Sequence, residues 1–353
     1  METIVAIDMG KRKSVVCTME RGSLKTQYCT VRTHPEVFHD RFVDLDAPNT
    51  IVLFEIGNQA GWLSDMLRGM GLDFKVANTN DPAWKWTNHP IKSDKKDALR
   101  LAMLYHQGFF PEVYMPCKAV RQKRMLIGYR QSLVDRLTQV KNSIRAILCT
   151  MAIDWPAGKN GWTQKRLNEL TEYARPLDAI ADACDFWRGQ LYTELQLYTA
   201  VKQQLDNVTF KLDAVQKEQS AVNLLQTVPG VGPRTAEALV AVIDDPHRFK
   251  NCRQVGNYVG FTPRRYQSGD MDRTGRISKR GNPLLRMLLV QAGWASLQYA
   301  WAREIYDRVC RGRTKRRKIA IVAVARHILM RCWAMLRDNK PWQCSTVKVA
   351  TWK

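Results

Sequence analysis

Residues 3–10 read TIVAIDMG, and residues 50–57 read TIVLFEIG. Each stretch is a short apolar run that ends in an acid, Asp8 in the first and Glu55 in the second. Short apolar runs rich in β-branched residues predict buried strands. Two adjacent strands of this kind would present Asp8 and Glu55 at the same edge of one sheet.

The residues around these runs predict further strands and helices in the first third of the chain. We expect strands at 3–9, 13–19, 25–31, 50–55 and 73–77, and helices at 35–43 and 59–71. Three strands, a helix and then a strand, a helix and a strand favour a mixed α/β sheet flanked by helices. This order is that of a ribonuclease-H-like fold.

Two more acids stand at the head of a third predicted helix, which runs from Asp94 to Gln107. Asp94 and Asp97 are three residues apart and share one helical face, so they would complete a cage of carboxylates. Hard divalent cations prefer oxygen ligands, and two of them stabilise both the attacking and the leaving oxygen of a phosphodiester. The four acids therefore predict a Mg²⁺ or Mn²⁺ site in a nuclease core. The alternative for each acid alone is a turn residue or a helix cap.

The composition favours a nucleic acid as partner. The chain has 353 residues, enough for two or three domains, and 55 Lys and Arg against 33 acids give a net charge of +22. Charged residues interrupt the first twenty positions, and residues 319–325 are too short an apolar run to span a bilayer. We therefore expect a cytoplasmic protein without a membrane segment. The nine cysteines form no CxxC pair, and no two histidines share a metal-ligand spacing, so we expect reduced cysteines and no zinc site.

The middle of the chain predicts a pair of long helices. We divide the chain at 1–115, 116–221 and 222–353, and in the middle part apolar residues recur with helical spacing between 126 and 148 and between 201 and 215. Two antiparallel helices would form a coiled-coil hairpin. The first is also basic, with seven Lys or Arg and one acid between Arg121 and Arg145. We expect nucleic-acid contacts at Arg121, Arg124, Arg130 and Arg136; a solvated helix face is the alternative.

The third part opens with a helix–hairpin–helix pattern, LLQTVPGVGPRTAEALVAVI at residues 224–243. Gly230 and Gly232 permit a close backbone approach, and the free N–H groups at the start of the following helix can hold a phosphate. Next comes GFTPRRYQSGDMDRTGRISKRG, residues 260–281, which we interpret as a flexible, basic phosphate-binding loop that leads into a helix near Pro283. Its cations are Arg264, Arg265, Arg273, Arg276, Lys279 and Arg280. Two serines, Ser268 and Ser278, lie among them, without an identifiable partner base.

The order of these motifs over nearly the whole chain resembles the insertion-sequence 110 family of transposases, also described as bridge-RNA-guided serine recombinases. The resemblance implies a RuvC-like domain with a DEDD tetrad at Asp8, Glu55, Asp94 and Asp97, and a C-terminal transposase domain with its catalytic serine at Ser268. It assigns Ser278 to phosphate contact. It also implies a structured non-coding bridge RNA, donor and target double-stranded DNA, and a dimer of dimers.

The function expected from this resemblance is strand exchange through a covalent phosphoserine intermediate, with Mg²⁺ or Mn²⁺ on the tetrad. A hydrolytic nuclease of the junction-resolvase type is the first alternative, in which water attacks and Ser268 is a loop residue. A non-catalytic nucleic-acid scaffold is the second. The tetrad argues against the scaffold, and the serine separates the two enzymes.

Overall fold

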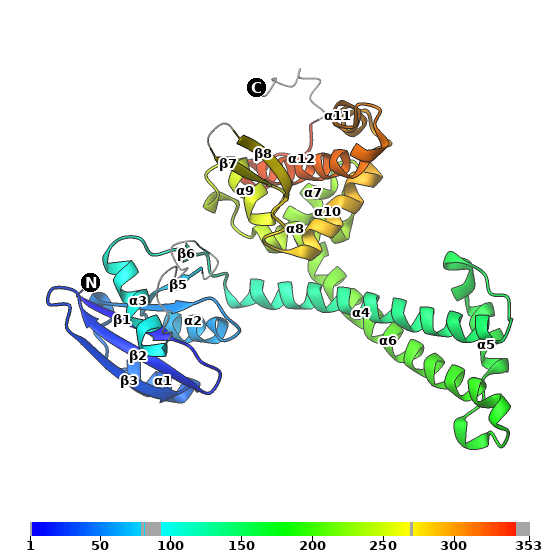
Figure 1. Ribbon diagram of the computed structural model, residues 1–353, viewed down its shortest axis with the longest axis horizontal. Coiled ribbons are helices and arrows are strands. Elements are labelled where there is room, and N and C mark those ends of the chain that lie inside the picture. Colours follow the sequence, from blue (N-terminus) through cyan, green and yellow to red (C-terminus); the bar gives the residue numbers. More distant parts are fainter. Residues whose placement is uncertain (1, 79–80, 82–92, 269–270, 344–353) are drawn as a thin grey trace. The chain divides into compact units, whose positions relative to one another are not determined.

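The computed structural model describes residues 2–78, 81, 93–268 and 271–343. Its contacts divide the chain into two compact units, residues 1–121 and 122–353. Figure 1 colours the chain from its N-terminus to its C-terminus and labels the elements of both units. The helical middle and the C-terminal helices belong to the same unit, and each unit is described by itself.

The first unit is built on a six-stranded mixed sheet in the order β3-β2-β1-β4-β5-β6. β1 pairs antiparallel with β2 and parallel with β4, and β4 pairs parallel with β5. The predicted strands are confirmed, and only the two-residue β6 was missed. The strands are β1 (Thr3–Asp8), β2 (Lys13–Glu20), β3 (Thr26–Arg32), β4 (Thr50–Glu55), β5 (Asp73–Ala77) and β6 (Glu112–Val113).

Helices cover both faces of this sheet. Because successive side chains of a strand point to opposite faces, β1 sends Val5 and Ile7 to one face and Ile4 and Ala6 to the other. The Val5 face packs against α1 (Pro35–Phe42) and α2 (Ala60–Gly69). The Ile4 face packs against α3 (Asp94–His106) through Leu101 and its neighbours. The predicted mixed sheet flanked by helices is therefore present.

The second unit begins with two long helices, α4 (Lys118–Thr150) and α6 (Phe186–Lys217), joined through α5 (Gln164–Tyr173). They run antiparallel, because Ile127 near the start of α4 clusters with Leu212 near the end of α6. A shared apolar seam holds the pair together. Its buried members include Leu133, Leu137, Val140, Ile144 and Leu148 of α4 and Leu191, Tyr198 and Val201 of α6.

The C-terminal part of this unit is a helical cluster around α12 (Arg317–Asp338), whose buried face runs from Ala320 to Met335. The other helices are α7 (Ser220–Gln226), α8 (Pro233–Ile243), α9 (Cys252–Val259), α10 (Pro283–Ser296) and α11 (Ala300–Cys310). Within the described residues one segment, Thr314–Asp338, is long and apolar enough to cross a membrane, with half of its most apolar window buried inside the protein. Burial of that kind is what a central core helix shows.

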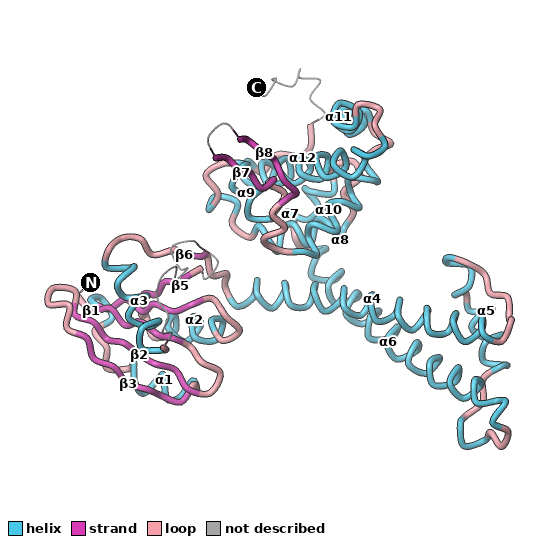
Figure 2. Tube along the Cα trace, viewed as in Figure 1, coloured by secondary structure: helices cyan, strands magenta, loops and turns pink. Residues whose placement is uncertain are grey.

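One element contradicts the prediction of a flexible loop after residue 263. β7 (Pro263–Ser268) and β8 (Met271–Ile277) form an antiparallel two-stranded hairpin, drawn as two magenta strands in Figure 2. The hairpin is stabilised by a cross-strand ion pair, in which Arg265 donates two hydrogen bonds to the Asp272 carboxylate. Every described residue from Pro263 to Arg276 is exposed, so the strand has no buried face and no apolar alternation that a sequence pattern could reveal.

Candidate functional site

Two of the predicted acids are the last residues of neighbouring parallel strands. Asp8 ends β1 and Glu55 ends β4, and the register that pairs Ile7 with Phe54 brings these two ends level. Both acids are partly buried. The strands that carry them are rigid, because Ile4, Ala6 and Leu53 have no exposed surface. The sheet therefore fixes the spacing of the two carboxylates at its carboxyl edge.

The alternation of side chains also decides which face the two acids share. Asp8 follows Ala6 by two residues and Glu55 follows Leu53 by two, so both continue the face that α3 covers. α3 carries the other two predicted acids in its first turn, where Asp97 is 4% exposed and Asp94 is exposed to solvent. All four predicted acids therefore belong to the same layer of the first unit.

Local chemistry explains why α3 begins where it does. Ser93 is the N-cap, and its side chain accepts a hydrogen bond from the Lys96 N–H, while the Asp97 N–H donates to the Ser93 carbonyl at 3.0 Å. Carboxylates in the first turn are favoured by the partial positive charge at a helix N-terminus. The first turn of α3 is therefore a place where two acidic side chains suit the helix.

An open pocket of about 560 Å³ adjoins Glu55 at the carboxyl edge of the sheet. Met9 and Lys11 line it from the segment after β1, and residues 56–60 line it from the segment after β4. Lys11 was not among the predicted site residues. The signal in the sequence was a cation three positions after the strand-end acid Asp8.

The described residues contain no group of three or more His, Cys, Asp or Glu side chains placed to hold a metal ion. Asp8, Glu55 and Asp97 each interact with other groups of the protein. The donor set nevertheless fits Mg²⁺ or Mn²⁺, because it offers carboxylate oxygens alone, at one sheet edge and on one covering helix.

Three of the four arginines predicted to contact nucleic acid along α4 are engaged inside the protein. Arg121 forms an ion pair with Asp65, and its guanidinium also donates to the carbonyls of Gly61 and Pro116. Arg124 donates to the carbonyls of Ala241 and Val242, the last turn of α8. The Arg124 guanidinium thus satisfies carbonyls that the C-terminal end of α8 leaves without helical partners. The positive charge of these two arginines does not need an external phosphate.

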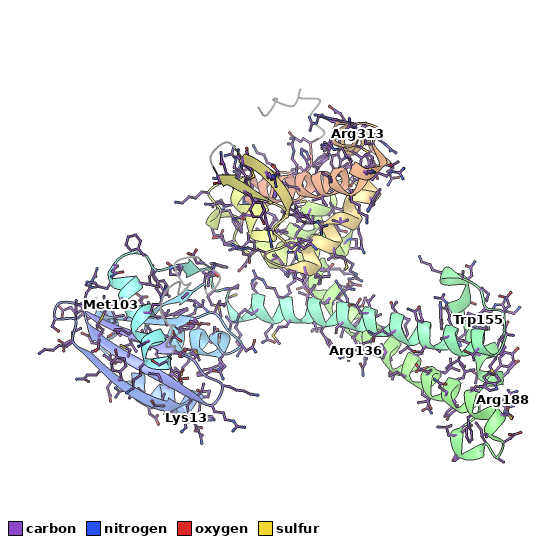
Figure 3. The ribbon with its side chains drawn as sticks, viewed as in Figure 1. Lys13, Met103, Arg136, Trp155, Arg188 and Arg313 are labelled. Atoms are coloured by element: carbon purple, nitrogen blue, oxygen red, sulfur yellow. The ribbon has the colours of Figure 1, made fainter. Side chains whose placement is uncertain are left out.

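The third of these arginines, Arg130, is 8% exposed, and its Nη2 lies 2.7 Å from Oε2 of the fully buried Glu237. Burial lowers the pKa of Arg130, and Glu237 partly offsets this by favouring the charged form. The pair joins α4 to α8. Of the four predicted arginines, Arg136 is the one that is exposed and has no ion pair among the described residues, and Figure 3 labels its position on α4.

The two predicted glycines of the α7–α8 turn have different environments. Gly230 has a φ of +93°, and a Cβ there would lie 2.1 Å from Ser296 Oγ of α10. Ser296 itself donates to the Pro229 and Ala292 carbonyls. Gly230 therefore serves close packing. Gly232 caps α8, is exposed, and has open space where a Cβ would be, so it is the one that a phosphate can approach.

The two candidate serines also differ in access. Ser268 is exposed at the end of β7, where it pairs with Met271. Ser278 Oγ is buried without a hydrogen-bond partner in the described structure, and the Ser278 N–H donates to the Thr262 carbonyl at 2.8 Å. A nucleophile must reach a phosphorus atom of an external strand. Among these two hydroxyls, only that of Ser268 is accessible.

The hairpin has two chemically different faces. Ser268 and Tyr266 are two residues apart on β7, and their partners across the ladder are Met271 and Arg273, so these four side chains share one face. The Tyr266 ring lies across Gly275, where a Cβ would be 3.3 Å from it. Arg265 and Asp272 lie on the opposite face, and their hydrogen-bonded ion pair lowers the pKa of Asp272.

Arg286 of α10 holds the base of the hairpin in place. It was not among the predicted site residues. Its Nη1 donates to the carbonyls of Val259, Arg280 and Gly281. A Cβ at Gly260 would lie 2.0 Å from the Arg280 carbonyl oxygen, and Lys279 itself has a φ of +56°. Arg264, Arg276, Lys279 and Arg280 are exposed around this base. In the sequence, Arg286 looked like one more cation of the basic segment.

Comparison with known proteins gives a consistent result. Residues 222–307 match the model described as "Transposase IS116/IS110/IS902 family", and residues 5–153 match a transposase model named for the DEDD proteins of IS110. The transposase for insertion sequence element IS1111A of Coxiella burnetii is 28% identical over 277 residues, which cover 72% of this chain and 70% of the relative.

Two further relatives extend this comparison. The transposase for insertion sequence element IS1328 of Yersinia enterocolitica is 23% identical over 307 residues, with 84% of each chain covered. The pilin gene-inverting protein of Moraxella lacunata is 30% identical over 122 residues, 34% of this chain and 38% of the relative. The similarity thus reaches proteins named for transposition and for DNA inversion.

Proposed function

Because the chain belongs to the insertion-sequence 110 (IS110) family of transposases, we propose that it cuts and rejoins DNA with a serine nucleophile and a divalent metal. Membership of the family implies a ribonuclease-H-like first domain and activity in DNA cleavage and strand transfer. The observation that carries the metal part is the level placement of Asp8 and Glu55 on the face covered by α3. The observation that carries the serine part is the exposure of Ser268.

The carboxylates Asp8, Glu55, Asp94 and Asp97 would hold Mg²⁺ or Mn²⁺. When bound, such an ion polarises the scissile phosphate and stabilises the charge that develops on its oxygens. Lys11, in the pocket beside Glu55, would hold a phosphate of the same strand.

Ser268 would supply the nucleophile. Its Oγ forms a bond to the phosphorus, the bond from phosphorus to one sugar oxygen breaks, and that sugar oxygen takes up a proton as the serine loses its own. The products are a phosphoserine link to one DNA end and a free hydroxyl on the other. The energy of the phosphodiester is retained, so the reverse attack by a sugar hydroxyl rejoins DNA without a nucleotide cofactor.

Arg273 is the cation best placed to act with Ser268, because both lie on the same face of the hairpin. Its guanidinium would donate to the non-bridging oxygens of the phosphate as their charge increases. Arg265 is held by Asp272 on the opposite face and would instead keep the two strands in register. The two arginines are therefore a matched pair for mutagenesis: same residue type, same hairpin, opposite faces.

The nucleic-acid partners would be donor and target DNA and a structured bridge RNA that selects them by base pairing. The net charge of +22 supports polyanionic partners of this size. The assembly would be a dimer of dimers, in which Ser268 of one protomer acts with the carboxylates of another. Co-expression of Asp8→Asn chains with Ser268→Ala chains should then restore DNA cleavage, although each variant alone is inactive. If the co-expressed chains stay inactive, Ser268 and the carboxylates must act within the same protomer.

A nicked suicide substrate tests the nucleophile. Protein, RNA, Mg²⁺ and a substrate that loses its short cut fragment should yield a protein–DNA adduct that survives denaturant and disappears with protease. Ser268→Ala should give no adduct, whereas Ser278→Ala and the neighbouring Gln267→Ala should keep it. Since Ser268 is exposed, its loss should leave the melting temperature unchanged. Cleavage by Ser268→Ala at the wild-type rate would assign the attack to water and the enzyme to the hydrolytic class.

A further inference from the structure

The second unit has a strongly basic corner where α11 is followed by α12. Residues 311–318 read RGRTKRRK, which places six cations in eight positions. All six side chains are exposed or partly exposed, and the described structure gives none of them an ion pair. Figure 3 labels Arg313 at this corner. No acid follows them in the sequence until Asp338.

The backbone of this basic corner is fixed. Arg311 and Gly312 have positive φ values of 50° and 71° and turn the chain sharply after α11. The N–H groups of Arg311, Arg313 and Arg316 donate to carbonyls three or four residues earlier, at 2.9–3.0 Å. The cations are therefore presented from a constrained turn and the short 3₁₀ helix Thr314–Arg316.

The position of these charges is unfavourable for the isolated helix. Arg317 and Lys318 stand in the first turn of α12, which has no acidic residue there. A cation at a helix N-terminus meets the positive end of the helix dipole, which is unfavourable. Helix stability therefore does not explain Arg317 and Lys318 at this position, whereas binding a polyanion does.

A pocket beside the basic corner offers a second kind of contact. It has a volume of about 460 Å³ and is lined by Trp294, Arg303, Tyr306, Thr314 and Arg317, with Asp307 as its one acid. Small-ligand pockets span about 300–1,000 Å³. Trp294 is 48% exposed, and its ring centroid lies 6.3 Å from that of Tyr306. An accessible indole beside arginines is a platform for a nucleobase and its phosphate.

We propose that this corner binds an unpaired stretch of nucleic acid, with one base stacked on Trp294 and the adjoining phosphates on Arg313 and Arg317. A duplex keeps the faces of its bases stacked against one another, so a base cannot stack on the indole without leaving the duplex. The proposal rests on the proposed function for its expectation of a nucleic-acid partner. It is independent of the serine and of the metal.

Binding of labelled oligonucleotides of about ten nucleotides tests the stacking contact. Full-length protein is titrated in EDTA, so that no cleavage occurs, with oligouridylate, with oligodeoxythymidylate and with a duplex of the same length. Trp294→Ala should weaken binding of a single strand about tenfold, since stacking on an aromatic is worth about 1–3 kcal/mol per base, and should change duplex binding less than about twofold. Trp294→Phe should retain most of the affinity. The RNA and DNA arms identify which strand is bound.

The phosphate contacts are tested by salt dependence. Arg313→Ala/Arg317→Ala should lower the slope of log affinity against log salt for a single strand by about 1.4, at roughly 0.7 per phosphate. The control is Lys211→Ala/Lys250→Ala, which removes two exposed cations of the same unit away from the corner and should lower the slope less. Unchanged single-strand binding by Trp294→Ala, or an equal loss for the duplex, would overturn the proposal. Because no variant here touches Ser268 or the carboxylates, this result stands apart from the test of cleavage.

Discussion

The carboxylate edge of the first unit and the serine hairpin of the second differ in what holds them in place. Asp8 and Glu55 end strands whose preceding residues have no exposed surface, and a capped helix carries Asp97. The hairpin has no buried face, and one exposed ion pair crosses it near Ser268. An isolated two-stranded hairpin is marginally stable in water. Core packing therefore holds the carboxylate edge in place, whereas the serine hairpin is held by its strand ladder and one exposed ion pair.

The largest effect should come from the buried carboxylates. Asp8→Asn or Asp97→Asn should reduce DNA cleavage by about a thousandfold or more, because each removes a metal ligand from one chemical step, and the double variant should lose little more. Asp73→Asn is the matched control, since Asp73 is an exposed acid at the opposite end of a strand in the same sheet. An Asp8→Asn enzyme that cleaves normally would remove the metal site from the account.

The buried ion pair between Arg130 and Glu237 tests whether the helices of the second unit are firmly packed. We expect that they are, in contrast to the exposed β7–β8 hairpin. Arg130→Ala should destabilise this unit by about 3–5 kcal/mol, because Glu237 would remain buried and unpaired. Arg136→Ala should leave stability within about 0.5 kcal/mol and reduce the salt slope of nucleic-acid binding by about 0.7–0.9. Urea unfolding and salt titration measure the two effects. Equal stability of both variants would mean that Arg130 is not structural.

Core and hairpin substitutions test the comparison itself. Leu101→Ala, under the carboxylates, should cost about 2–5 kcal/mol by opening a cavity. Tyr266→Ala, on the serine face, should change stability by less than about 0.5 kcal/mol, because the ring is 59% exposed. Thermal or urea unfolding decides the question. Comparable losses from both would show that the hairpin is packed as firmly as the sheet.

The smallest expected effect is on the stability of the β7–β8 hairpin as the pH falls. The Arg265 guanidinium lowers the pKa of Asp272 through their hydrogen bonds. The ion pair therefore stabilises the hairpin fully above the ordinary carboxyl pKa, and this stabilisation is lost as the pH falls through the lowered pKa. Cutting of the hairpin by an acid-tolerant protease should therefore be constant from neutral pH down to mildly acidic pH and increase only below the ordinary pKa of 3.8. Arg265→Ala should be cut a few times faster than wild type at neutral and mildly acidic pH, and the difference should vanish once Asp272 is protonated. Equal cutting of the two proteins would leave the ion pair without a role.

The sequence was sufficient for the strands and helices of the first unit, because its apolar periods are regular and Asp8 and Glu55 end unbroken apolar runs. It was also sufficient for the long helical pair. It was insufficient for the hairpin, whose residues are exposed on both faces and follow no alternation. It could not assign Arg130 either, because the partner, Glu237, lies far along the chain and only the fold brings them together. Charge counts alone made that arginine look available to nucleic acid.

In the proposed mechanism Ser268 of one protomer and the carboxylates of another act in the same cleavage step. The most direct measurement is whether the Ser268–DNA adduct on a nicked suicide substrate requires the carboxylates and the metal. Wild-type protein with Mg²⁺ should form the adduct, and Asp97→Asn, or wild type in EDTA, should form none while still binding the substrate. Adduct formation by Asp97→Asn at the wild-type rate would contradict the account, because the serine would then act without the carboxylate edge.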